Sequence, residues 1–162
     1  MERFLPLLNK AKVVMGLAPI TPNASIPDLV CMKGYQKCTV IIAVDNGNTV
    51  TGSAITLKEA TAVGGTDART LAFSRMWANM DTDASDTLVE IAVASSTFTT
   101  LTTNNKNALY VIEIDADDLD MDNGFDCVGV GTANAANMVL SVVYILHAPR
   151  YAPTLDRSAI ID

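Results

Sequence analysis

The chain has 162 residues, a formal net charge of −7, 49% hydrophobic residues and only 18% charged residues. This length is typical of a single domain with its own core, and the composition argues against extensive disorder. The acidic balance argues against binding to a phosphate backbone, for which a basic stripe is expected, so we expect no nucleic-acid partner.

Residues 1–30 are predicted to form an N-terminal arm. Its first part, residues 1–17, has apolar side chains at a helical spacing, which predicts a short helix. These side chains are Phe4, Leu8, Ala11 and Met15. Three prolines within residues 18–27 favour an extended segment after the helix. The helix packs either on its own domain or on a neighbouring subunit, and we name Phe4, Leu8 and Ile20 as candidate contacts.

A β-rich pattern begins at Cys38. Residues 38–44 are rich in β-branched side chains and predict a strand. The following Asp45-Asn46-Gly47-Asn48 is a strong hairpin signal, because Asn-Gly tolerates positive φ angles. The hairpin predicts a returning strand over residues 49–60, with a bulge near Gly52.

Further short strands are predicted at intervals along the rest of the domain. They cover residues 70–77, 88–93, 109–114 and 125–131, with another around Phe98. With turn signals between them, about eight strands indicate an all-β, antiparallel β-sandwich or jelly-roll-like domain over residues 31–148. Residues 149–162 form a C-terminal tail, in which Tyr151 and Ile160 are candidate contacts with a neighbour.

The strongest strand signal is residues 138–146, a nearly unbroken apolar run. In an extended strand both faces of this run are apolar, which predicts a central strand covered on both sides. The second cover has to come from the N-terminal segment, local loops or another subunit, so Val143 is a candidate contact. The run is too short to cross a bilayer as a helix, and we expect no membrane partner.

An acidic stretch at residues 115–124 invites comparison with a calcium-binding loop. Asp118, Asp120 and Asp122 match the first three ligand positions of an EF-hand. Asn123 stands where that loop needs glycine, and Gly129 where it needs a bidentate glutamate. A short turn capped by aspartates is therefore favoured over a metal site.

No catalytic pattern is present in the sequence. The single histidine, His147, has no nucleophile signature near it, and an ordinary hydrogen bond at a strand end is expected. Gly129-Val-Gly131 lacks the third glycine and the helix of a dinucleotide site. We expect no enzyme and no cofactor.

The three cysteines are predicted to differ in exposure. Cys38 and Cys127 share strand faces with apolar residues and are expected to be buried. Cys31 follows the proline-rich segment and is expected to be the most exposed. We name it as a candidate for an intersubunit disulfide on a particle that leaves the cell.

Several segments resemble small proteins of the head-structural modules of tailed bacteriophages and prophages. These are Phe4-Leu-Pro-Leu-Leu8, Lys33-Gly-Tyr35, residues 39–62, residues 120–127 and residues 139–151. The resemblance implies a decoration (cement) subunit made in the bacterial cytoplasm and located on the virion surface. Such a subunit binds the outside of the major capsid protein shell as a trimer or dimer and stabilises it. No catalytic residues are implied.

Two other functions remain open. One is a neck or tail component of the same particle. The other is a carbohydrate-binding β-sandwich, in which Trp77, Tyr110 and Tyr151 would supply stacking platforms.

Overall fold

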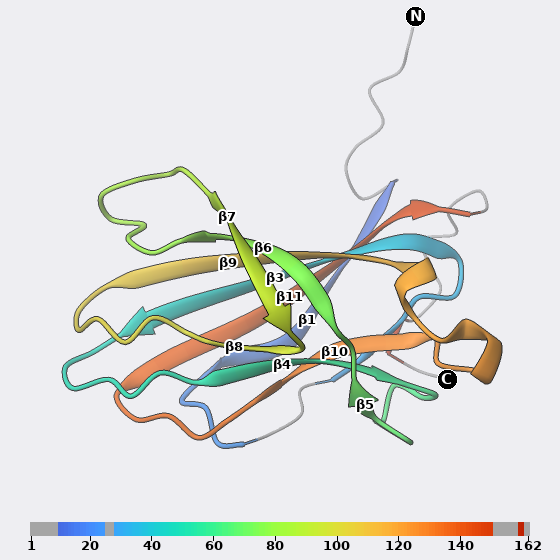
Figure 1. The fold of residues 1–162 in the computed structure, drawn as a ribbon, viewed down its shortest axis with the longest axis horizontal. Helices are drawn as coiled ribbons and strands as arrows, with labels where there is room; N and C mark the ends of the chain where they lie inside the picture. The colour runs from blue at the N-terminus through green and yellow to red at the C-terminus, as the bar shows by residue number, and fades with distance from the viewer. Residues whose placement is uncertain (1–9, 25–27, 151–158, 161–162) are drawn as a thin grey trace, which may run out of the picture.

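The computed structural model describes residues 10–24, 28–150 and 159–160. Within them, eleven strands form two antiparallel sheets, which confirms the all-β sandwich (Figure 1). Sheet A has the order β1-β11-β3-β9-β6-β7. Its strands are β1 (Ala11–Ile20), β3 (Tyr35–Asn46), β6 (Phe73–Asn79), β7 (Val89–Ser95), β9 (Asn107–Asp115) and β11 (Met138–Pro149).

Sheet B is smaller and has the order β2-β10-β4-β5, with β8 also paired to β4. Its strands are β2 (Val30–Cys31), β4 (Ala54–Ala60), β5 (Arg69–Thr70), β8 (Thr97–Thr99) and β10 (Cys127–Thr132). The described helices are two 3₁₀ turns, η2 (Ala116–Asp118) and η3 (Met121–Asn123), between β9 and β10. No helix among the described residues is long and apolar enough to span a membrane.

The core lies between the two sheets. One face of sheet A contributes fully buried side chains from its central strands, and sheet B contributes buried side chains from β4 and β10. Tyr144 links the two layers, because its hydroxyl accepts a hydrogen bond of 3.1 Å from the backbone N–H of Val130. Burial raises the pKa of Tyr144, which stays a neutral phenol within this core.

The strand predicted at residues 138–146 is β11, and its central position is confirmed. It lies between β1 and β3 in sheet A (Figure 1, with β1 in blue and β11 in orange-red). Met138, Leu140, Val142, Tyr144 and Leu146 are buried against sheet B. The opposite face, which includes Val139 and Val143, is only partly covered. Of the two faces predicted to be covered, one is buried and the other is only partly covered by the described residues.

The predicted helix over residues 1–17 is wrong for residues 11–17, which belong to β1. Residues 1–9 lie outside the described residues, and Phe4 and Leu8 with them. The apolar spacing has another cause: β1 is irregular between Met15 and Leu17. Met15 is on the outer face of sheet A, opposite Val143, whereas Leu17 pairs with Val142 on the inner face. This change of phase imitates a helical period.

The predicted hairpin between residues 38–44 and 49–60 is also wrong. β3 pairs with β9 and β11 in sheet A, whereas β4 belongs to sheet B. The Asn46-Gly47 segment therefore carries the chain from one sheet to the other. Gly52 has a φ of 72° in this connection, not in a strand, so the bulge predicted there is absent.

Gly16 is the position in β1 where a side chain is least tolerated. A Cβ there would overlap the buried ring of Tyr144, with Cδ2 only 2.9 Å away. We expect Gly16→Ala to lower the free energy of unfolding by about 1–3 kcal/mol, measured by urea denaturation. Gly64→Ala is the matched control, because a Cβ at Gly64 meets no atom within 4 Å. Equal midpoints for the two variants would contradict the prediction.

Candidate functional site

The most distinctive surface is the outer face of sheet A, where apolar side chains follow one row across five strands. Strand register places Met15 opposite Val143, Val143 opposite Ile41, Ile41 opposite Val111, and Val111 opposite Trp77. We call Met15, Val143, Ile41, Val111 and Trp77 the apolar row. Because neighbouring strands are about 4.8 Å apart, the row is about 20 Å wide.

The apolar row is at least partly open to solvent. Met15 is 56% exposed, and Val13, its neighbour along β1, is 46% exposed. The other four members are half-buried between their strand neighbours. Val13 also pairs with Ile145, which extends the apolar surface by a second, shorter row. A contiguous apolar surface of this kind is a candidate site of protein contact.

The surroundings of the row differ at the two ends of the strands. At one end, Lys37 forms an ion pair of 2.7 Å with Asp115. At the other end lies a hollow of about 440 Å³, whose lining includes Pro19, Leu109, Val139 and the single charged residue Asp45. A polar border is therefore present at the Lys37–Asp115 end, whereas apolar side chains dominate the hollow at the other end.

The predicted contact residues occupy different places. Val143 belongs to the apolar row, between Met15 and Ile41, and Ile20, at the end of β1, is 42% exposed. Ile160 is 44% exposed, next to the buried Ala159. Tyr151 lies outside the described residues. Sequence reasoning missed Met15, Ile41 and Val111 as contacts, although apolar residues at both parities of residues 38–44 were a usable signal.

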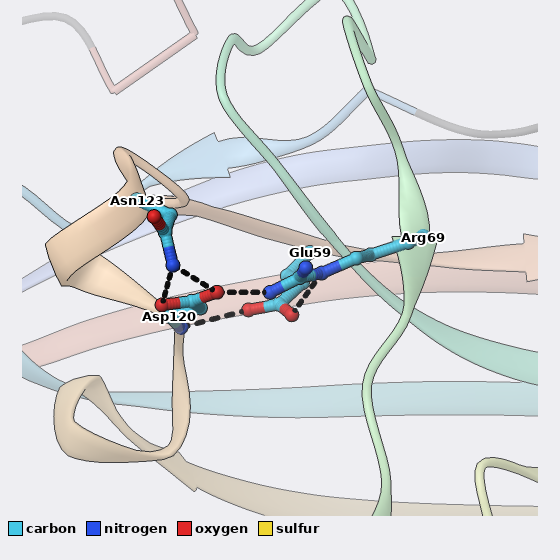
Figure 2. Close-up of polar contacts among 4 residues, drawn as sticks. All are labelled: Glu59, Arg69, Asp120 and Asn123. Carbon is cyan, nitrogen blue, oxygen red and sulfur yellow. Dashed lines mark hydrogen bonds and ion pairs between the residues drawn. The ribbon is translucent and has the colours of Figure 1, made fainter.

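The acidic stretch at residues 115–124 forms internal contacts within the protein (Figure 2). Asp120 Oδ2 is 2.6 Å from Arg69 Nη2, and Asn123 Nδ2 donates to both Asp120 oxygens at 2.9 Å. Asp118 accepts a hydrogen bond from the backbone N–H of Asp115. Arg69 and Asn123 hold the pKa of Asp120 below its ordinary value. These contacts agree with a capped turn.

Glu59 anchors this turn to sheet B. Its side chain is only 6% exposed, and Oε1 accepts a hydrogen bond of 2.8 Å from Arg69 Nε. Oε2 accepts another, of 3.0 Å, from the backbone N–H of Asp120. The guanidinium of Arg69 also lies 3.8 Å from the ring centre of Phe125. The network joins β4, β5 and the turn before β10 (Figure 2).

His147 has the ordinary role that its position predicts. Its Nε2 is 3.0 Å from Thr39 Oγ1 on the adjacent strand. Of the proposed carbohydrate platforms, Tyr110 is fully buried, and its hydroxyl accepts a hydrogen bond from Leu101 N. Tyr110 therefore cannot stack on a sugar. Trp77 is a member of the apolar row, with the Arg75 guanidinium 5.8 Å from its ring centre.

The relative exposure of the cysteines matches the prediction. Cys38 and Cys127 are buried, and Cys31 is half-buried. Cys31 lies opposite Cys127 in the pairing of β2 with β10. Together with Asp126 they form the single group of potential metal ligands found among the described residues, with their ligand atoms within 4.8 Å of one another.

No protein-family model and no curated protein matches this chain. Among solved structures, the chain is similar to the crystal structure of the SPBc2 prophage-derived protein YomS. The two share 15% sequence identity with a TM-score of 0.46, over 84% of this chain and 91% of that chain.

Proposed function

We propose that this protein is a non-enzymatic structural protein of a tailed-bacteriophage particle, which decorates the head by binding the outside of the major capsid protein shell. The observation that carries the proposal is the apolar row, a rigid surface of about 20 Å on a six-stranded sheet. The resemblance of the sequence to phage head proteins supplies the identity of the partner.

The rest of the molecule agrees with this role. The apolar row is built from paired strands, so binding requires little ordering of backbone. The net charge of −7 suits a surface that faces solvent without non-specific adhesion. A protein that binds the assembled shell and not its free subunits stabilises the shell by mass action. We further propose that it acts as a trimer or dimer placed between capsomers.

The direct test is reconstitution on shells assembled from the major capsid protein of the same genome. We expect the protein to co-sediment with the shells and to appear on their outer surface by cryo-electron microscopy. Its copy number should scale with the number of capsomers, and decorated shells should withstand higher temperature than bare ones. A ring of copies at one vertex, or on the tail, would instead identify a neck or tail component. Absence from the particle would overturn the proposal.

A further inference from the structure

Cys31 and Cys127 occupy directly opposed positions in the antiparallel pair β2–β10. The backbone of Met32 donates a hydrogen bond of 2.8 Å to the carbonyl of Asp126, one residue beyond the cysteines on each strand. Cys31 N donates in another direction, to the carbonyl of Ala159 at 2.7 Å. This pattern identifies Cys31 and Cys127 as a non-hydrogen-bonded pair, in which opposed residues approach most closely.

That position satisfies the geometric requirement for a disulfide. In a non-hydrogen-bonded pair the Cα atoms are about 4.5 Å apart, and disulfides span Cα separations of about 4.4–6.8 Å. Both side chains lie on the same face of sheet B, and the two Sγ atoms are within 4.8 Å of each other. Little backbone movement is therefore needed to join them.

The surroundings give the two sulfurs different chemistry. The hydrogen bond with Cys127 lowers the pKa of Cys31 below its ordinary value and outweighs burial and the charge of Asp126, which both raise it, so Cys31 is the more readily deprotonated of the two thiols. The backbone N–H of Lys33 donates to Cys31 Sγ at 3.5 Å and assists. The same contact with Cys31, together with burial, raises the pKa of Cys127. Cys31 is half-buried and Cys127 buried, so Cys31 is the sulfur that a reagent reaches first.

We propose that Cys31 and Cys127 form an intrachain disulfide when the protein meets a low-molecular-weight disulfide such as oxidised glutathione. The Cys31 thiolate attacks one sulfur of the reagent, forms a mixed disulfide and expels one thiolate. Cys127 then loses its proton, and its sulfur attacks Cys31 Sγ and expels the second thiolate. Asp126 Oδ1, which accepts from Cys127 Sγ at 3.2 Å, lies where that proton departs.

The reaction is balanced. Two electrons pass from the protein thiols to the small disulfide, which leaves as two thiols carrying the two protons. The bond closes a loop between positions 31 and 127 and fixes the two-residue strand β2 to β10. A disulfide that closes a long loop removes much of the conformational entropy of the unfolded chain. We therefore expect the melting temperature to rise by about 5–15 °C. This inference does not depend on the proposed function.

A thiophilic metal ion is a different occupant for the same cluster. Cys31, Cys127 and Asp126 would supply three ligands, as zinc accepts. However, Lys33 Nζ lies 2.9 Å from Asp126 Oδ2, and its positive charge opposes a cation at this place. The disulfide is therefore the favoured product.

The test uses the full chain, purified with reductant and then equilibrated with a mixture of oxidised and reduced glutathione. We expect the denatured product to retain one free thiol of three, and peptide mapping to join the peptides of Cys31 and Cys127. Cys38, buried with its pKa raised to about 12, should remain the free thiol. The melting temperature should rise, and added reductant should reverse the rise.

Variants distinguish the Cys31–Cys127 disulfide from a bond to Cys38, an intermolecular disulfide, stable glutathionylation and zinc binding. Cys38→Ser should still form the bond, whereas Cys31→Ser should lose both the bond and the rise in melting temperature. Because Cys31 is only half-buried, its variant should fold even if Cys127→Ser does not. Covalent dimers through Cys31, or Cys31 that stays glutathionylated, would overturn the proposal. The proposal would also be overturned if the protein bound one zinc ion that protected both thiols and if oxidation formed no disulfide between Cys31 and Cys127.

Discussion

Met15→Asp is expected to weaken binding to the capsid shell at least about 30-fold, because it places an unpaired carboxylate in the proposed contact, at the β1 end of the apolar row. Burying a charge without a partner costs about 2 kcal/mol or more, which corresponds to this loss of affinity. Met15 is 56% exposed, so the folded state should tolerate the change. Co-sedimentation of the variant with assembled shells measures the affinity, and its thermal melting curve checks the fold.

Two further variants give this experiment its controls. Val89→Asp makes the same chemical change at a side chain that is 62% exposed, on the edge strand β7 and outside the apolar row. It should bind like the unmodified protein. Val143→Asp, which lies inside the row next to Met15 and is half-buried, should lose binding and also some stability. Unchanged affinity for Met15→Asp would show that the shell contacts another surface.

Glu59→Ala is expected to lower the free energy of unfolding by about 2–3 kcal/mol. The carboxylate accepts hydrogen bonds from Arg69 Nε and from the backbone N–H of Asp120, and it is almost fully buried. Its removal leaves the Asp120 N–H without its acceptor and opens space beneath the turn. Chemical denaturation measures the change.

Lys37→Ala is the matched control for Glu59→Ala. It also removes an ion pair, that between Lys37 and Asp115, but both of these side chains are about half exposed. Surface ion pairs of this kind add little to stability, so the denaturation midpoint should stay unchanged. A loss as large as that of Glu59→Ala would show that burial is not the reason for the importance of Glu59.

The β character of the chain and its central strand were predictable from residues near one another in sequence. Met138–Leu146 is apolar at both parities, which is sufficient to indicate a central strand. The ordinary hydrogen bond of His147 and the burial of Cys38 followed from strand position alone.

Strand partners were not predictable in this way. Asn46-Gly47 fits a hairpin, yet the strands on either side of it belong to different sheets. The apolar inner face of each sheet is buried only by packing against the other sheet. This tertiary packing overrides the local preference of Asn46-Gly47 for a hairpin turn. Likewise, the irregularity at Gly16 shifts the phase of β1, so that its apolar residues imitate a helix. A period measured along the chain does not reveal such a shift.

Only part of the candidate contact surface was predictable from the sequence, because the rest depends on which strands pair. Val143 was identifiable because the whole strand around it is apolar. Met15, Ile41 and Val111 become neighbours of Val143 only through the register of four strands that are far apart in sequence. The pairing of Cys31 with Cys127 likewise depends on the register of β2 and β10.

The position of β11 between β1 and β3 also limits when the strands of sheet A can pair during synthesis. The ribosome releases β1 and β3 early, but the strand that joins them is residues 138–149. Until those residues emerge, both early strands have exposed edges and apolar faces, a state prone to aggregation. β3, β9, β6 and β7 can pair before β11 emerges, but β1 can join sheet A only late in synthesis. These long-range pairings make the folding of sheet A slow relative to that of a helical protein of similar size.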